Sequence, residues 1–231
     1  KKTSDADYIS CLLKAALICR KAGDYETALQ YINKADKNSL RLYKSDSREY
    51  ADIVTGMAGV YHDMGCALND MVYLRQEERL LKKAELIYRK EGAKAVSQLI
   101  NNLTDQASYN NNVGNSPMAE MLFQEAITLS KNEFGNDSPA YASSLNNLGV
   151  LYYNTGLFKQ AETYLVEAVG VFDKLQNKHL IFNAVCLNNL GSLYYETGNY
   201  KVAEDLLNKS RRLMESRFNT GSPHYSVILN N

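Results

Sequence analysis

The apolar and polar residues of the chain follow the period of an α-helix, and the pattern returns at a fixed interval. The stretch SSLNNLGVLYYNTGLFKQAETYL (residues 143–165) is closely matched by VCLNNLGSLYYETGNYKVAEDLL (residues 185–207), forty-two residues later. In both copies the apolar residues are spaced by three, four and seven positions, which is the spacing of a helix face and not the alternation of a strand. Each copy is therefore predicted to form two helices joined by a short turn.

Glycines mark the predicted turns and extend the repeat along the whole chain. Successive marker glycines are separated by 42, 49, 42 and 42 residues, which predicts five copies. The markers are Gly23, Gly65, Gly114, Gly156 and Gly198. Glycine is favoured where a helix ends, because the left-handed backbone there carries little steric penalty without a Cβ. The longer step is interpreted as an insertion of about two helical turns around residues 66–73, sequence CALNDMVY.

Small residues keep the same positions relative to the marker glycines. They recur seven residues before the marker and five residues after it, which predicts a close approach of the paired helices. These positions are Ala16, Ala58, Gly149 and Gly191 before the turn, and Ala28, Ala119, Ala161 and Ala203 after it. Because a single hairpin cannot bury its apolar face alone, the copies are expected to stack into a continuous core.

Capping residues mark the predicted starts of several helices. Each proline follows a serine, at positions 116–117, 138–139 and 222–223. Serine at the N-cap followed by proline at the first helical position is typical of a helix start. Asp24 and Asn199 directly follow marker glycines and are expected to cap the second helix of their hairpins.

These positions resemble the pattern of the tetratricopeptide repeat (TPR) family. The matching residues of one copy are Leu145, Leu148, Gly149, Tyr152, Gly156, Phe158, Ala161, Leu165 and Ala168. The common TPR period is about 34 residues. The longer form found here, in which SPxY leads into LNNLG, looks like the repeats of kinesin light chains and of bacterial TPR arrays that precede an effector domain. The resemblance implies an all-α solenoid, a right-handed superhelix of stacked hairpins that binds protein or peptide in its concave groove.

The repeat predicts one TPR array over residues 1–231. Its five copies are expected at approximately 9–50, 51–99, 100–141, 142–183 and 184–225. The final LNN at 229–231 matches the start of LNNLG, so residues 226–231 are predicted to begin a sixth copy and the chain to be a fragment of a longer protein.

The third copy fits the pattern less well than the others. Gln106 and Asn110 stand where apolar residues are expected. An alternative register would use Leu103 as the core leucine and lengthen the loop that follows. Both registers are compatible with the sequence.

One face of the first helix in the last copies is predicted to line the groove. It lies beside the core positions and carries an asparagine row, since asparagine recurs at the same place in successive copies. The predicted groove residues are Asn146, Val150, Tyr153, Asn188, Ser192, Tyr195 and Asn230. A carboxamide both donates and accepts hydrogen bonds, so such a row could hold the backbone of an extended peptide. The alternative is a packing role, with Asn147 or Asn189 hydrogen-bonding within the stack.

Composition narrows the classes of partner. The 26 basic and 26 acidic residues give zero formal net charge, which argues against nucleic acid as a ligand. No run of 18 apolar residues occurs, so no membrane span is predicted. The four cysteines lack metal-type spacing and favour a reduced, cytoplasmic setting. The chain begins at Lys1 and not at methionine, so the sequence leaves a removed leader open.

Candidate chemical sites are few. His62, Asp63 and Cys66 are close along the chain, but structural zinc normally takes four ligands, and Gly65 is expected to break the helix between them. Cys186 has no histidine placed nearby in the sequence to activate it. We therefore predict no metal, no cofactor and no catalysis.

The sequence favours a protein- or peptide-binding scaffold. The alternative is a ligand-sensing regulatory module of a larger bacterial enzyme or regulator, for example a caspase-like peptidase, with its effector domain C-terminal to this chain. A third possibility left open by the sequence is self-association through the exposed last repeat.

Overall fold

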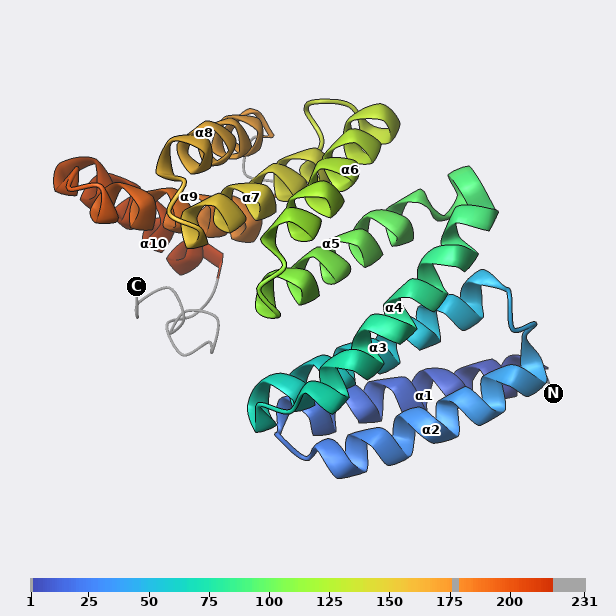
Figure 1. The fold of residues 1–231 in the computed structure, drawn as a ribbon. Helices are drawn as coiled ribbons and strands as arrows, with labels where there is room; N and C mark the ends of the chain where they lie inside the picture. The colour runs from blue at the N-terminus through green and yellow to red at the C-terminus, as the bar shows by residue number, and fades with distance from the viewer. Residues whose placement is uncertain (1, 176–178, 218–231) are drawn as a thin grey trace. The chain divides into compact units, whose positions relative to one another are not determined.

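The computed structural model describes residues 2–175 and 179–217, and every regular element in these ranges is a helix (Figure 1). The elements are α1 (Lys2–Lys21), α2 (Tyr25–Leu42), α3 (Arg48–Leu68), α4 (Met71–Glu91), the 3-10 turn η1 (Gly92–Ala95), α5 (Val96–Asn112), α6 (Ser116–Phe134), α7 (Pro139–Asn154), α8 (Phe158–Lys174), α9 (Leu180–Glu196) and α10 (Tyr200–Arg217). The predicted all-α class is confirmed.

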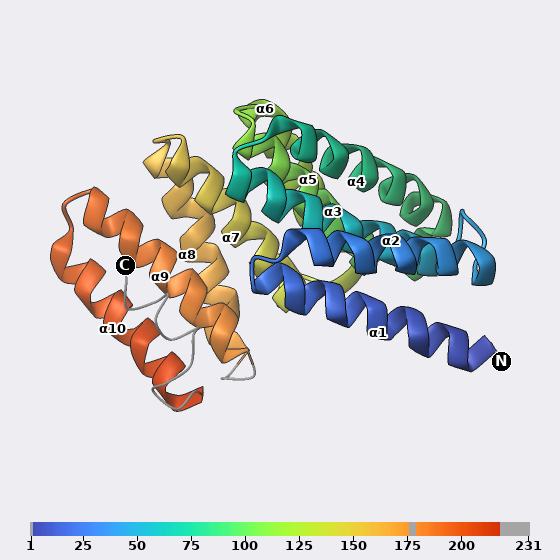
Figure 2. The same ribbon diagram turned by 90° about the horizontal axis from the view of Figure 1, so that it is seen from below.

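The helices fall into two compact units, residues 1–114 and 115–231. In the first unit α1 packs on α2 and α3 on α4, and α3 also contacts α1 and α2. In the second unit α7 packs on α8 and α9 on α10, while α6 packs on α7 and α8 on α9. The hairpins within a unit lie side by side in both views (Figures 1 and 2). Each unit is therefore a stack of two antiparallel helix pairs and one further helix, which is α5 packed on α4 in the first unit and α6 packed on α7 in the second.

Four of the five marker glycines occupy the predicted turns. Their φ angles lie between 76° and 82° at Gly23, Gly114, Gly156 and Gly198. At Gly156 this left-handed conformation lets the next amide, that of Leu157, donate to the carbonyl of Tyr152 at 2.8 Å. That bond satisfies a carbonyl at the helix end that would otherwise lack a partner.

The fifth marker, Gly65, is not at a turn, and the prediction that it breaks a helix was wrong. It lies within α3, where an added Cβ would come within 2.5 Å of Leu74 Cδ2 on α4. The turn follows at Asn69, which adopts φ 50°, and Asp70 caps α4 by accepting from the Val72 amide at 2.8 Å. The inserted residues therefore lengthen both helices: α3 and α4 have 21 residues each, against 16 and 17 in α7 and α8.

Two of the four predicted caps on described residues, Asp24 and Ser138, are present as side-chain hydrogen bonds. Asp24 Oδ1 accepts from the Thr27 amide at 3.1 Å, and Ser138 Oγ accepts from the Tyr141 amide at 3.2 Å. At Asn199 the backbone carbonyl accepts from the Ala203 amide, and no side-chain cap bond is present among the described residues. Ser116 differs, since α6 begins at this residue and the N-cap position falls to Asn115. The predicted cap at Ser222 lies outside the described residues.

The predicted small positions lie in the core, where the helices of a hairpin approach closely. The alanines at these positions are at most 2% exposed: Ala16, Ala28, Ala58, Ala119, Ala161 and Ala203. A Cβ added to Gly149 would lie 2.7 Å from Leu165 Cγ, and one added to Gly191 would lie 2.9 Å from Leu207 Cγ. The contact between a small residue and a leucine is thus repeated in successive hairpins, as the spacing predicts.

The third copy keeps the common register. Leu103 is fully buried, and Gln106 occupies its core position at 4% exposure. The Gln106 amide donates to Asn102 Oδ1 at 2.9 Å and to Glu85 Oε2 at 2.7 Å, so its buried polar group is satisfied. Gly114 stays in the turn, and the alternative register with a longer loop is therefore wrong.

Candidate functional site

The predicted groove residues lie on α7 and α9, the first helices of the last two hairpins, which contact each other. Asn146 and Asn188 are buried, at 7% and 6% exposure. Val150, Tyr153 and Ser192 are half-buried, and Tyr195 is 60% exposed. The remaining predicted residue, Asn230, lies outside the described residues.

A cavity of about 250 Å³ opens between these helices. It brings together three of the predicted residues, Val150, Tyr153 and Ser192, while Asn146, Asn188 and Tyr195 do not line it. The other lining residues are Asn154, Leu165 and Asn189. Asn154 was missed by the groove prediction, although it lies four residues after Val150 and therefore on the same helix face. We call this region, the cavity together with Tyr195, the α7–α9 face.

The asparagine row does not form an open ladder. Asn189 Nδ2 on α9 donates to Asn146 Oδ1 on α7 at 2.9 Å, so Asn146 is already engaged by the next repeat. For Asn189 the structure shows the hydrogen bond within the stack that the sequence offered as an alternative. Asn188 occupies the equivalent position in the next repeat; its Oδ1 is buried and has no hydrogen-bond partner among the described residues. Asn146 therefore serves the packing of α7 against α9, whereas Asn188 retains a free acceptor.

Tyrosines fix the two hairpins beside the cavity. The Tyr152 hydroxyl donates to Glu120 at 2.8 Å, and the Tyr194 hydroxyl donates to Glu162 at 2.6 Å, one repeat later. Burial raises the pKa of Tyr152 to about 12, with the Glu120 hydrogen bond adding to the effect. The hydrogen bond that the Tyr194 hydroxyl donates to Glu162 is the main reason that the pKa of Tyr194 also rises to about 12. Both phenols therefore stay protonated donors near neutral pH.

Aromatic pairs flank the cavity in equivalent positions of the two repeats. The ring centroids of Tyr153 and Phe158 are 6.1 Å apart, and those of Tyr195 and Tyr200 are 5.5 Å apart in an edge-on arrangement. Tyr200 is 64% exposed. The face thus combines flat aromatic surface with amide and hydroxyl groups.

The side chains weighed for chemistry have other partners in the structure. His62 Nδ1 lies 3.0 Å from Glu77, Asp63 pairs with Arg20 at 2.9 Å, and Cys66 Sγ lies 3.7 Å from His62 Nε2. Within the described ranges, no group of three or more His, Cys, Asp and Glu side chains is placed to hold a metal ion. Burial raises the pKa of the Cys186 thiol to about 12, so it is a poor nucleophile near neutral pH.

The chain matches models of a known protein family. Two models described as tetratricopeptide repeat match it, one over residues 98–174 and 152–216 and the other over residues 9–39. The chain belongs to the tetratricopeptide repeat family. The predicted all-α solenoid of TPR hairpins is therefore confirmed. None of the curated proteins compared with the chain matches it. Among the described residues, no TPR helix is both long and apolar enough to cross a membrane.

Solved structures share this TPR fold at low sequence identity. BtubC (BKLC) from P. vanneervenii has a TM-score of 0.72 and 19% identity over 96% of this chain and 92% of that chain. A Podosopora anserina kinesin light chain protein with nearly identical TPR-like repeats has a TM-score of 0.68 and 15% identity over 91% of this chain and 97% of that chain. The Rap conjugation gene regulator of the plasmid pLS20, in complex with the Phr peptide, has a TM-score of 0.69 and 14% identity over 95% of this chain and 61% of that chain. The likeness at these identities concerns the fold.

Proposed function

We propose that this TPR chain is a protein-interaction module and that its α7–α9 face binds an extended peptide segment. The observation that carries the proposal is the cavity of about 250 Å³, which is lined by Val150, Tyr153 and Ser192. These side chains come from the first helices of two consecutive hairpins. A ligand in the cavity would therefore contact two repeats at once.

The lining of the cavity suits a peptide. Val150 and Leu165 offer apolar surface, whereas Asn154 and Ser192 offer groups that both donate and accept hydrogen bonds. A peptide backbone presents one donor and one acceptor at most residues, so these side chains match it irrespective of the ligand sequence. We expect an apolar ligand side chain to enter between Val150 and Leu165 while the ligand backbone bonds the polar groups.

The other predicted residues take different roles in this proposal. Tyr195 supplies exposed aromatic surface beside the cavity, which costs little side-chain entropy on binding. Asn188 lies four residues before Ser192 on α9, but its unpaired Oδ1 is buried outside the cavity, so we assign it no contact with the ligand. Asn146 acts indirectly, because its carbonyl oxygen already accepts from the Asn189 that lines the cavity.

A solved structure of similar fold, which contains a bound peptide, supports the proposal of a peptide partner. The Rap conjugation gene regulator was solved in complex with the Phr peptide, and its fold is similar to that of this chain at a TM-score of 0.69. The low identity carries no information about peptide sequence. We therefore propose the class of ligand, an extended peptide, without a sequence motif.

The proposal is tested by selecting peptides from a phage-displayed library of random sequences on the purified chain. Binding of the enriched peptides is then measured by fluorescence anisotropy with the wild type and with Ser192→Arg, which fills the cavity. We expect Ser192→Arg to weaken binding by about tenfold or more, equivalent to about 1.4 kcal/mol.

Thr163→Arg is the matched control, because Thr163 is exposed on α8 and does not line the cavity. It should bind the selected peptides as the wild type does. Peptides that bind Ser192→Arg and the wild type equally, or a library that yields no binder, would contradict the proposal.

A further inference from the structure

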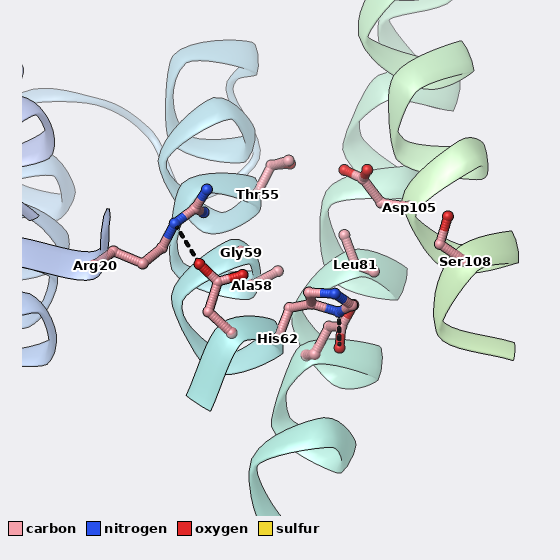
Figure 3. Close-up of a pocket in the computed structure, with 10 residues that line it drawn as sticks. Arg20, Thr55, Ala58, Gly59, His62, Leu81, Asp105 and Ser108 are labelled. Carbon is pink, nitrogen blue, oxygen red and sulfur yellow. Dashed lines mark hydrogen bonds and ion pairs between the residues drawn. The ribbon is translucent and has the colours of Figure 1, made fainter. Parts of the chain in front are cut away.

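A second cavity, of about 390 Å³, lies within the first unit and is lined from four helices (Figure 3). Its charged and polar lining comprises Arg20 from α1, His62 and Asp63 from α3, Glu77 from α4, and Asp105 and Ser108 from α5. Ala58, Gly59 and Leu81 add a small apolar surface. We call it the first-unit pocket. It shares no residue with the α7–α9 face.

Two ion pairs fix the walls of the first-unit pocket. Arg20 Nε lies 2.9 Å from Asp63 Oδ2, and His62 Nδ1 lies 3.0 Å from Glu77 Oε1. Glu77 is only 3% exposed, so its carboxylate depends on His62 for compensation. Gly59 leaves room for the arginine, because an added Cβ would come within 2.4 Å of an Arg20 terminal nitrogen. The basic groups of the pocket are therefore held by acidic partners.

Asp105 is the charged residue of the first-unit pocket that belongs to neither ion pair. Its carboxylate faces the pocket from α5, opposite the wall that carries Arg20 and Thr55 (Figure 3). Among the described residues it has no hydrogen-bond or ion-pair partner. Asp105 is exposed at the mouth of the pocket, and the loss of water around its carboxyl among the surrounding side chains is the main reason that its pKa rises to about 6. The charge of Glu77 adds to the effect, whereas His62 and Arg20 oppose it.

The balance of charge in the pocket is negative. Asp63, Glu77 and Asp105 carry three negative charges when ionised, against one positive charge on Arg20 and one on protonated His62. A neutral His62 makes the balance more negative. Ser108 and Thr55 add hydroxyl oxygens that can accept hydrogen bonds from an N–H donor. These features favour a cation with N–H groups.

We propose that the first-unit pocket binds an organic cation, the ammonium or guanidinium group of a ligand, with Asp105 as its counter-ion. The group would enter from the open side of the pocket, contact the Asp105 carboxylate and donate to the Ser108 hydroxyl, which lies beside it on α5. Such a group could belong to a basic side chain of a bound polypeptide or to a free alkylamine. The volume of about 390 Å³ accommodates a side chain of this size.

The proposal is tested by isothermal titration calorimetry on the whole chain at pH 7.5. The probes are the tripeptide acetyl-Gly-Lys-Gly-amide, the diamine cadaverine, and acetyl-Gly-norleucine-Gly-amide as a neutral control of nearly the same shape. We expect the lysine tripeptide or cadaverine to bind and the norleucine peptide not to bind. Comparing the two cations tells whether the group is recognised on a polypeptide or as a free amine.

Two further measurements assign the binding to Asp105. Asp105→Asn keeps the shape of the side chain and should weaken cation binding by about tenfold or more, whereas Glu49→Gln, on the exposed surface of α3, should have no effect. In the wild type, lowering the pH from 7.5 to 5 should weaken binding by about tenfold, because only about a tenth of a carboxyl with a pKa near 6 is ionised at pH 5. Protonation of His62 at low pH acts in the same direction.

Equal binding of the lysine and norleucine peptides, or full binding by Asp105→Asn, would overturn the proposal. So would failure of both cations to bind the wild type. Because the pH dependence is measured on the wild type, it does not require any variant to fold. Peptide selection with Ser192→Arg is unaffected by these outcomes, so the two sites are tested separately.

Discussion

Gly149 lies in α7 where that helix passes closest to α8, and Gly149→Ala should destabilise the chain. An added Cβ would lie 2.7 Å from Leu165 Cγ, 2.9 Å from its Cδ2 and 3.3 Å from its backbone nitrogen. Leu165 is fully buried, so neither its side chain nor its backbone can move away cheaply. Overpacking of this kind costs about 1–3 kcal/mol. The higher helix propensity of alanine than of glycine offsets about 1 kcal/mol of this cost. The expected net loss is about 1 kcal/mol, and the upper limit is about 2 kcal/mol.

Gly170 provides the matched control on the neighbouring helix. It lies within α8, is exposed, and an added Cβ would meet nothing within 4 Å. Gly170→Ala should therefore stabilise the chain by about 0.5–1 kcal/mol through helix propensity alone. The difference between the two variants, about 2 kcal/mol, isolates the cost of the Leu165 contact because propensity is common to both.

Urea unfolding followed by circular dichroism measures both variants. A double-mutant cycle adds Leu165→Ala, which removes the side chain that the new Cβ would meet. In that background Gly149→Ala should lose most of its penalty, giving a coupling energy of about 1 kcal/mol or more. If Gly149→Ala stabilises the wild-type chain as much as Gly170→Ala does, the close approach of α7 and α8 is not as described.

Two further predictions concern α3. Asn69→Ala should destabilise the chain by about 1–2 kcal/mol, because Asn69 adopts the left-handed conformation at φ 50°. Asn69→Gly should be about as stable as the wild type. Urea unfolding midpoints measure both variants, and equal stabilities of the two would refute the role of the turn. The hydrogen bond to Glu77 raises the pKa of His62. The His62–Glu77 pair therefore stabilises the fold fully at a pH below the pKa of His62 in the unfolded chain, and this stabilisation is lost as the pH rises through the pKa of His62 in the folded chain. His62→Gln should therefore lower the urea midpoint at pH 5.5 more than at pH 8.5, and a pH-independent difference would count against the pair.

The glycines show why the repeat could be predicted and where prediction failed. Gly156 and Gly65 belong to the same series by spacing, yet the first adopts positive φ with open space around it and the second packs against Leu74 inside a helix. Spacing cannot separate these two uses of a missing Cβ. The neighbouring Asn69–Asp70 pair held the necessary signal, since asparagine tolerates the left-handed conformation and aspartate caps helices.

The groove prediction shows a similar division. Helical spacing placed Val150, Tyr153 and Ser192 on one face, and the structure brings these three into one cavity. Asn146 is buried instead, and its Oδ1 accepts a hydrogen bond from Asn189 of the following repeat. A pattern analysed one helix at a time contains no information about such neighbours.

The first-unit pocket was not predicted at all. Its charged residues come from four helices and are separated along the chain by up to 85 residues, from Arg20 to Asp105. Each of them is an ordinary surface charge in its own helix, and only the packing of α1, α3, α4 and α5 gives them a shared environment. His62 and Asp63 drew attention in the sequence as candidate metal ligands, although the structure gives them Glu77 and Arg20 as partners.

The lengthened hairpin of α3 and α4 has a consequence for how the array forms. Ala58 and Gly65 are both buried, and they lie one heptad apart on the same side of α3. Because α3 and α4 have 21 residues each, against 16 and 17 in α7 and α8, this hairpin has a longer internal seam, and more of its stabilisation is local in sequence. In an array whose units otherwise depend on their neighbours, such a hairpin is where folding can nucleate before it propagates to the adjacent pairs.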